Sequence, residues 1–122
     1  METLSLNHAT TIVDGALAMA RESACAPLSV AVLDAGGHLV AFKREDNSGI
    51  LRPQIAQAKA WGALGMGIGS RALAQRAEAA PAFFAALTDI SVGRIVPVAG
   101  GVLIRDFSSI SCRNKLYWFY IC

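Results

Sequence analysis

Charged side chains and long apolar runs are both scarce in this 122-residue chain. Charged residues make up 16% of it and the net charge is +2 at pH 7, whereas about a quarter of an ordinary globular domain is charged. So small and dispersed a positive charge argues against a nucleic-acid partner. No apolar run approaches the roughly 20 residues that cross a bilayer, which argues against a membrane protein. The N-terminus lacks a basic segment, so we expect no secretory signal.

Cysteine motifs and familiar catalytic motifs are also missing. The three cysteines lie far apart, have no CxxC spacing and leave one thiol over under any pairing; they are Cys25, Cys112 and Cys122. We therefore expect free thiols in a reducing cytoplasm rather than a disulfide framework. The chain contains no G-x-S-x-G elbow, no HExxH and no Ser/His/Asp set that spacing alone can assemble.

One glycine-rich segment invites a cofactor interpretation. Gly67-x-Gly69-x-x-Ala72 fits the loose form of the dinucleotide-binding fingerprint. That fingerprint works only where a strand precedes the glycines and a helix N-terminus meets the pyrophosphate. An alanine-rich segment with helical character precedes these glycines, and no suitably spaced acidic residue follows at a strand end. We interpret the segment as a flexible connector.

The most informative stretch runs from Val30 to Lys59. Val30 to Leu33 form a continuous apolar run, which is typical of a strand covered on both faces. Two glycines then supply turn chemistry and His38 to Lys43 resume an extended pattern, so a β-hairpin is predicted. A polar cluster follows at residues 43–49, and Pro53 suits the first turn of a helix. A charged loop between a hairpin and a helix N-terminus is a place to look for a ligand.

Helices are predicted on both sides of this stretch. Apolar residues recur at helical spacing from Leu6 to Ala20, with Ser5 or Asn7 as the cap. A second helix is expected from Pro53 to about Ala63, where glycines should break it. A third should run from Arg71 to Ala79, capped by Ser70, and a short helical turn should follow from Pro81 to Leu87. Further strands are predicted at 94–98 and 102–105, joined by a Gly100-Gly101 turn.

The segments GGHLVAFKRED and IAQAKAWGA resemble the signature of the GlcG/HbpS-like family, and the resemblance runs from about Leu4 to about Asp106. This family comprises small α/β proteins, some of which bind haem, and includes the C-terminal domain of PduO-type adenosyltransferases. The resemblance implies an α/β (α+β) fold with profilin-like α/β/α layers, in which helices flank a central antiparallel sheet. It also implies a homo-oligomer, dimeric or higher.

The C-terminal end departs from the family pattern. Residues 1–106 form the expected domain, and residues 107–122, FSSISCRNKLYWFYIC, form an atypical tail. Relatives normally continue with a glycine-rich strand and a closing helix, so a truncated or frame-shifted gene would explain the change. A missing core strand would remove roughly 5–9 kcal/mol of burial, since each large side chain contributes about 1.5–3 kcal/mol. We expect Leu116 to Ile121 to act as a substitute strand, or a second chain to cover the edge.

Two histidines are candidate haem iron ligands. Imidazole ligates haem iron, and the chain has His8, in the first turn of the first predicted helix, and His38, where relatives also carry histidine. The alternative for each is a solvent-facing polar residue at a cap or a turn.

The other candidate ligand-binding residues follow the family pattern in the loop, the second helix and the Gly-Gly turn. Arg44 would hold a carboxylate, such as a haem propionate, through its bidentate fork, and Asp46 would orient it. Lys59 would add a second cation to the same cavity, although Gly62 stands where relatives usually have threonine. Gly100 and Gly101 would allow the backbone to approach a ligand closely. The alternatives are a self-paired loop, a helix-surface lysine and a plain hairpin turn.

Three functions stay open at this point. The first is a small-ligand binding or accessory protein for haem or a related tetrapyrrole, as the family resemblance implies. The second is an accessory enzyme of glycolate or diol metabolism that acts on a small carboxylate. The third is an oligomeric assembly domain without a ligand.

Overall fold

The computed structural model describes residues 4–105 and 116–121. They form four helices and four strands, in the order α1 (Leu6–Glu22), β1 (Ser29–Leu33), β2 (Leu39–Arg44), α2 (Arg52–Met66), α3 (Ser70–Ala79), α4 (Pro81–Ile90), β3 (Gly101–Arg105) and β4 (Leu116–Ile121).

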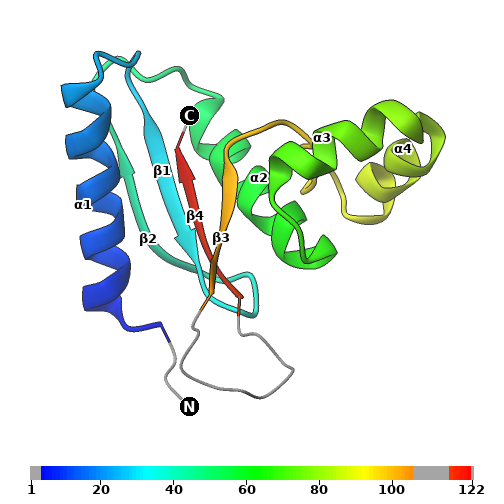
Figure 1. Cartoon of the computed structure of the whole chain (residues 1–122), viewed down its shortest axis with the longest axis horizontal. Helices are drawn as coiled ribbons and strands as arrows, with labels where there is room; N and C mark the ends of the chain where they lie inside the picture. Colours follow the sequence, from blue (N-terminus) through cyan, green and yellow to red (C-terminus); the bar gives the residue numbers. More distant parts are fainter. Residues whose placement is uncertain (1–3, 106–115, 122) are drawn as a thin grey trace.

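The strands make one antiparallel sheet in the order β2-β1-β4-β3 (Figure 1). In the β1–β2 hairpin, Val30 pairs with Lys43, and on its other side Val30 pairs with Ile121 of β4. The strand β4 therefore lies between β1 and β3.

Alternate residues of β1 face two different helices. Val30 and Val32 pack with the small and branched residues of one stripe of α1: Ala9, Val13, Ala16 and Ala20. Ala31 and Leu33 point to the other side, where they pack among Ala56, Ala60 and Ala63 of α2. Because alanine has a short side chain, both helices lie close to the sheet. The expected α/β/α arrangement is thus confirmed, with α1 on one face and α2 on the other (Figure 1).

The first helix and the hairpin form as the sequence predicted. Ser5 is the N-cap of α1, and its Oγ accepts a hydrogen bond from the backbone N–H of His8 at 3.1 Å. The hairpin turn closes through Asp34, whose backbone N–H donates to the carbonyl of His38 at 2.9 Å.

The helix α2 is longer than predicted, because Gly62 and Gly65 do not break it. It continues through Gly62 and Gly65 and ends at Gly67, which has a left-handed φ of 69°. Gly62 is a packing position: a Cβ there would lie 3.1 Å from Cγ2 of Ile95. The helix that ends the α3–α4 pair is also longer than predicted, since α4 runs to Ile90.

The predicted strand at residues 94–98 was wrong. This segment carries no strand hydrogen bonds, and its Ile95 is buried against Gly62 of α2. The apolar pattern of the segment therefore reflects contact with a helix. The next strand starts only at Gly101.

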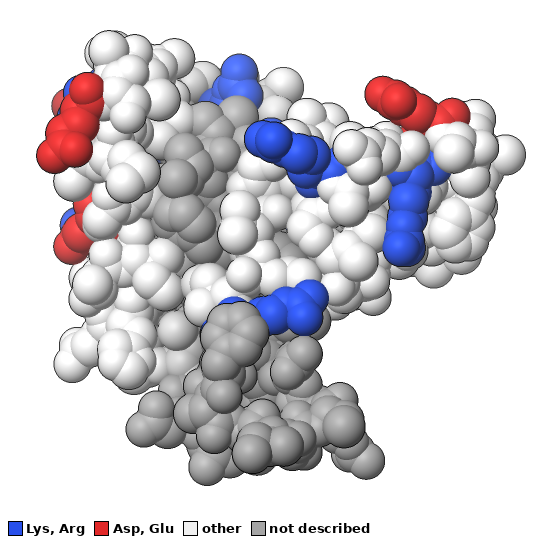
Figure 2. Space-filling view, viewed as in Figure 1, with Lys and Arg blue, Asp and Glu red and all other residues white. Residues whose placement is uncertain are grey.

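The helices α3 and α4 extend beyond the β3 edge of the sheet (Figure 1). Leu73 of α3 and Phe84 of α4 are buried in one cluster with Ala60 and Ala63 of α2. The opposite side of α4 leaves Phe83 and Ile90 exposed. The face shown in Figure 2 is mostly uncharged, and its charged side chains lie in a few small groups. Among the described residues, no helix is long and apolar enough to cross a membrane.

Candidate functional site

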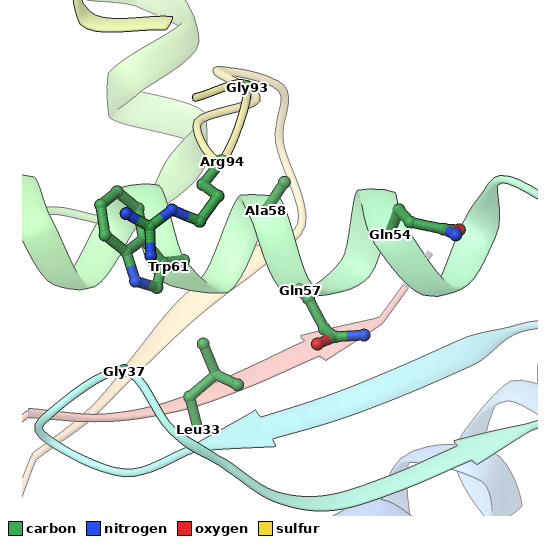
Figure 3. A pocket seen from close by; sticks show the side chains of 8 residues that line it. All are labelled: Leu33, Gly37, Gln54, Gln57, Ala58, Trp61, Gly93 and Arg94. Carbon is green, nitrogen blue, oxygen red and sulfur yellow. The ribbon is translucent and has the colours of Figure 1, made fainter. Parts of the chain in front are cut away.

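A pocket of about 350 Å³ lies between the hairpin turn, α2 and the segment that follows α4 (Figure 3). Leu33, at the end of β1, is buried at its base, while Gln54 and Arg94 are exposed at its rim. The residues that line it are Leu33, Gly37, Gln54, Gln57, Ala58, Trp61, Gly93 and Arg94. None of these eight side chains is acidic, so the pocket carries the positive charge of Arg94.

The indole of Trp61 fixes the shape of this pocket. It lies against the hairpin turn, where a Cβ on Gly37 would come within 3.0 Å of Cδ1 and Nε1 of the indole. Gly37 also has φ +80°, a conformation that disfavours any L side chain. Glycine at this position therefore lets the turn and the indole come together.

The guanidinium of Arg94 lies over the face of Trp61. Its Cζ is 4.2 Å from the ring centroid, a cation–π distance. Its Nε donates to the carbonyl of Ser91 at 3.0 Å. No acceptor among the residues that the structure describes lies within hydrogen-bond distance of its two Nη groups. The arginine is thus held by one hydrogen bond from Nε and by its contact with Trp61, and its Nη groups stay available to a ligand.

The two glutamines add neutral polar groups to the pocket. Nε2 of Gln57 donates to the carbonyl of Pro53 at 3.3 Å, one turn earlier in α2. This bond leaves the side-chain oxygen of Gln57 available as an acceptor. Figure 3 shows that Gln57 points from α2 toward the sheet, on the same side as Leu33. The pocket therefore combines an apolar base with a rim of amides and one cation.

His38 follows Gly37 directly and lies beside this pocket without lining it. Its Nδ1 is 3.1 Å from Oδ1 of Asp34, and its side chain is 80% exposed. Oδ1 of Asp34 also accepts the backbone N–H groups of Gly36 and His38, each at 2.9 Å. With Nδ1 facing a carboxylate, Nε2 is the ring nitrogen that faces away from the protein.

The pKa of Asp34 is lowered in this turn. Partial burial by itself raises the pKa of the carboxyl, but the hydrogen bonds from His38 and Gly36 and the attraction of the His38 ring outweigh burial. The carboxylate is therefore the preferred form of Asp34 in the folded chain.

His8 lies in the exposed first turn of α1 and does not line the pocket. Two clusters of buried residues separate α1 from α2 across the sheet. The two histidines are thus not brought together on one side of the sheet.

Arg44 and Asp46 lie at the other end of the hairpin. Nε and Nη2 of Arg44 both donate to the carbonyl of Ser48, at 3.1 and 2.9 Å. The hydroxyl of Ser48 is in turn 2.9 Å from that of buried Ser29, the partner of Arg44 in the sheet. The fork of Arg44 therefore closes its own loop, and Asp46 is exposed in that loop. Their role in binding a ligand stays a prediction.

Lys59, Gly100 and Gly101 meet where α2 passes β3. Lys59 is 4% exposed, and its Nζ donates to the carbonyl of Ala99 at 3.2 Å. A Cβ on Gly101 would lie 2.8 Å from the carbonyl oxygen of Lys59, so the close approach that this glycine permits is to the helix backbone. The N–H of Gly101 donates to the Ser70 hydroxyl. Lys59 thus lies toward the β3 edge, whereas Arg44 is on the β2 edge, and neither lines the pocket of Figure 3.

None of the eight residues that line the pocket was predicted as a site residue. The four whose side chains carry polar groups are Gln54, Gln57, Trp61 and Arg94. Arg94 was assigned to a strand, and Trp61 was noted only as a helix residue. The one available signal was the pair of glycines before His38, because such a turn lets another element approach closely. The turn did not reveal which element approaches.

A small α/β domain with a ligand-sized pocket between its sheet and a helix is the class that the fold and the site define. The family described as "Haem degrading protein HbpS-like" matches residues 4–111. The chain therefore belongs to the HbpS-like family. No curated protein matches it.

Several solved structures are similar to this chain. A double mutant of HbpS from Streptomyces reticuli has a TM-score of 0.79 and 23% identity, over 100% of this chain and 75% of that one. A PduOC:heme complex has a TM-score of 0.81 and 22% identity, over 99% and 83%. The ORFY protein of Klebsiella pneumoniae has a TM-score of 0.78 and 18% identity, over 100% and 79%. At these identities the similarity shows the shared fold.

Proposed function

We propose that this chain binds haem or a related tetrapyrrole. Family membership supports this, because the family is described by haem degradation, and a similar fold was solved as a haem complex. The observation that carries the proposal is His38, an exposed imidazole whose Nδ1 contacts Asp34. A carboxylate on the second ring nitrogen is the usual support of a metal-binding histidine, since it fixes the tautomer and the ring orientation.

The pocket beside His38 suits part of such a ligand. Its volume of about 350 Å³ is at the small end of the usual range for ligand sites, roughly 300–1,000 Å³. Its base is apolar and its rim is polar, as expected for a site that takes one edge of a flat apolar ring system. His38 would hold the iron that haem supplies, while the pocket takes the edge of the ring.

A haem titration of the purified protein, followed by its Soret absorbance, tests this proposal. We expect a sharp Soret band at one equivalent. His38→Ala should weaken haem affinity by more than about 10-fold, since loss of an outer-shell partner alone costs about 10- to 100-fold. His8→Ala is the matched control and should bind as the unchanged chain does. The absence of a band would refute haem binding, and a band that His38→Ala leaves untouched would refute the role of His38.

A second candidate function is binding or turnover of a small carboxylate. The modest volume of the pocket, its arginine and its two amides favour it. A panel of organic acids and tetrapyrroles distinguishes the two candidates, because a ligand that binds the folded chain raises its melting temperature. Stabilisation by an organic acid alone would favour the second candidate, and turnover lost in Arg94→Ala but kept in His38→Ala would add an enzymatic role. The homo-oligomer and the cytoplasmic location stay predictions.

A further inference from the structure

Arg94 differs from other arginines of this chain in what its guanidinium contacts. Arg44 donates from two nitrogens to one backbone carbonyl, and Arg21 forms an ion pair with Glu45. Arg94 donates only from Nε, to Ser91, and presents its face to Trp61. Among the described residues, its two Nη groups meet no acceptor.

The position of Arg94 is fixed before any ligand arrives. The contact with Trp61, with Cζ 4.2 Å from the ring centroid, holds the guanidinium over the indole. The bond to Ser91 holds its inner edge at the turn before Gly93, which has φ +75°. A pre-oriented donor loses less entropy on binding than a mobile one. The Nη groups of Arg94 can therefore bind a ligand in the pocket with little loss of side-chain entropy.

No protein carboxylate neutralises this cation within the pocket. The lining contains no acidic residue. The nearest acid along the hairpin turn is Asp34, and its Oδ1 already accepts from Gly36 and His38. The remaining polar groups of the pocket are neutral, namely the two glutamine amides and Nε1–H of Trp61, which accordingly add donors without adding charge.

We infer that the pocket is a carboxylate site, in which the Nη groups of Arg94 bind an acid group on an apolar ligand. A planar fork matches a carboxylate in two parallel hydrogen bonds. The apolar lining residues Leu33 and Ala58 favour a carboxylate carried on an apolar body over a free inorganic anion, which would lose hydration without gaining enough donors. For a tetrapyrrole that group is the propionate. This inference rests on the proposed function and moves the anion contact from Arg44, where the sequence placed it, to Arg94.

The test separates the carboxylate from the ring and from iron. Metal-free mesoporphyrin, which has two carboxylates, is compared with its neutral bis(hydroxyethyl)amide by fluorescence titration. The unchanged chain should bind the diacid at least about 10-fold more tightly, because hydrogen bonds to charged groups are the strong ones. Arg94→Gln should abolish that preference, while Arg94→Lys should keep part of it. Arg76→Gln, on the exposed side of α3, is the matched control and should keep all of it.

Each outcome bears on one claim. If the diacid and the diamide bind equally to the unchanged chain, or if Arg94→Gln keeps the preference, the carboxylate site is refuted while tetrapyrrole binding stands. If neither porphyrin nor haem binds, both the inference and the proposed function fall. A preference that Arg44→Gln removes and Arg94→Gln keeps would return the contact to Arg44. Thermal melts of every variant establish that each one is folded.

Discussion

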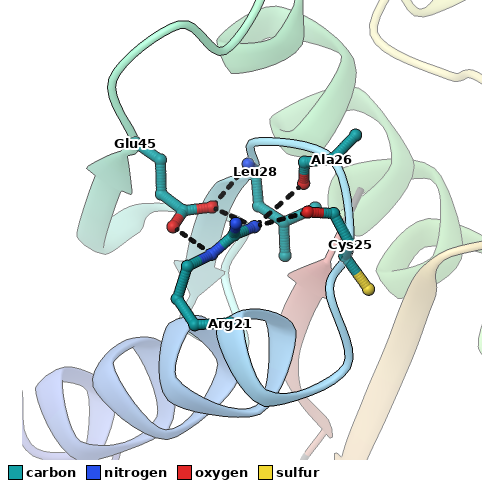
Figure 4. Close-up of polar contacts among 5 residues, drawn as sticks. All are labelled: Arg21, Cys25, Ala26, Leu28 and Glu45. Atoms are coloured by element: carbon teal, nitrogen blue, oxygen red, sulfur yellow. Dashed lines mark hydrogen bonds and ion pairs between the residues drawn. The ribbon is translucent and has the colours of Figure 1, made fainter.

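Arg21 and Arg94 lie at opposite ends of β1 and are used in opposite ways. Figure 4 shows Arg21 at the start of the strand, where Nη2 donates to the carbonyls of Cys25 and Ala26 and Nε pairs with Glu45 at 2.8 Å. Arg94, beyond the other end of the strand, has one hydrogen bond and one aromatic face. The first guanidinium contacts two carbonyls and a carboxylate of its own chain, whereas the second contacts a single carbonyl.

The difference shows how to distinguish a structural arginine from a binding one. At the Arg21 end, Glu45 accepts the N–H of Leu28 at 2.7 Å while its own N–H donates to the carbonyl of Leu28 at 2.8 Å. These bonds, together with those of Arg21, hold the end of α1 to the hairpin. At the Arg94 end, the guanidinium borders a pocket instead of further protein acceptors. An arginine is a candidate for ligand binding when some of its N–H groups have no acceptor within the protein and a cavity lies beside them.

The largest expected loss of stability comes from a substitution at the Arg21 end of the strand. Glu45→Ala removes the acceptor of the partly buried Leu28 N–H and the partner of Arg21. We expect a loss of about 1–3 kcal/mol in the free energy of unfolding, the cost of leaving such groups unpaired. Urea unfolding at pH 7 measures it, and Glu45→Gln should recover part of it because its oxygen still accepts from Leu28.

The matched control is Lys43→Ala. Lys43 pairs with Asp14 at 2.7 Å, but both side chains are more than half exposed. An exposed pair contributes about 0–1 kcal/mol. If Lys43→Ala destabilises the chain as much as Glu45→Ala does, the polar contacts of Arg21 and Glu45 in Figure 4 have no special structural role.

The sequence predicted the elements whose residues face a continuous core. The apolar run of β1 is buried on both sides, and the stripe of α1 packs on one of them, so periodicity alone found both. The same reasoning failed at residues 94–98, where Ile95 is buried by α2 rather than by a sheet. It failed again at Gly62, which was expected to break the helix but lies inside it, where Ile95 leaves little room for a Cβ. Both errors have one cause, a tertiary contact between segments far apart in the chain.

The site was harder to predict because composition does not show how a charge is used. The densest polar cluster, residues 43–49, drew attention to Arg44, but its fork closes its own loop on Ser48. Lys59 was expected beside it and instead reaches a carbonyl near β3. Arg94 has no polar cluster around it, and its contact with Trp61 appears only once the chain is folded. His38 was expected directly after the turn, and it lies there, since two glycines marked that turn.

A substitution at Gly37 tests the structure of the pocket. Its effect on the free energy of unfolding should be smaller than that of Glu45→Ala. Gly37→Ala places a methyl group within 3.0 Å of the indole of Trp61 and forces alanine to φ +80°. A left-handed backbone costs a non-glycine residue about 1–2 kcal/mol. Gly67→Ala is the matched control, because it has φ +69° with nothing within 4 Å of the added methyl. Both variants should lose similar stability in urea, and only Gly37→Ala should shift the tryptophan fluorescence and weaken mesoporphyrin binding. Equal fluorescence and equal affinity in the two variants would show that the turn does not position Trp61.

The smallest expected effect comes from removing the charge of Asp34 while its hydrogen bonds are kept. Asp34→Asn keeps an oxygen that accepts the N–H groups of Gly36 and His38, so the turn should persist and only the charge is lost. Because the pKa of Asp34 in the folded chain is lowered from 3.8, its ionised form stabilises the fold above that pH, and this contribution disappears as the pH falls through the folded value. The unchanged chain should therefore be slightly more stable than Asp34→Asn at pH 7, and the difference should shrink as the pH falls below 3.8. Urea midpoints across this range measure it, with Asp46→Asn as the control, since among the described residues Asp46 accepts no hydrogen bond. A difference between the unchanged chain and Asp34→Asn that is independent of pH would mean that the turn depends on the shape of the side chain, and the carboxylate would then support His38 without stabilising the fold.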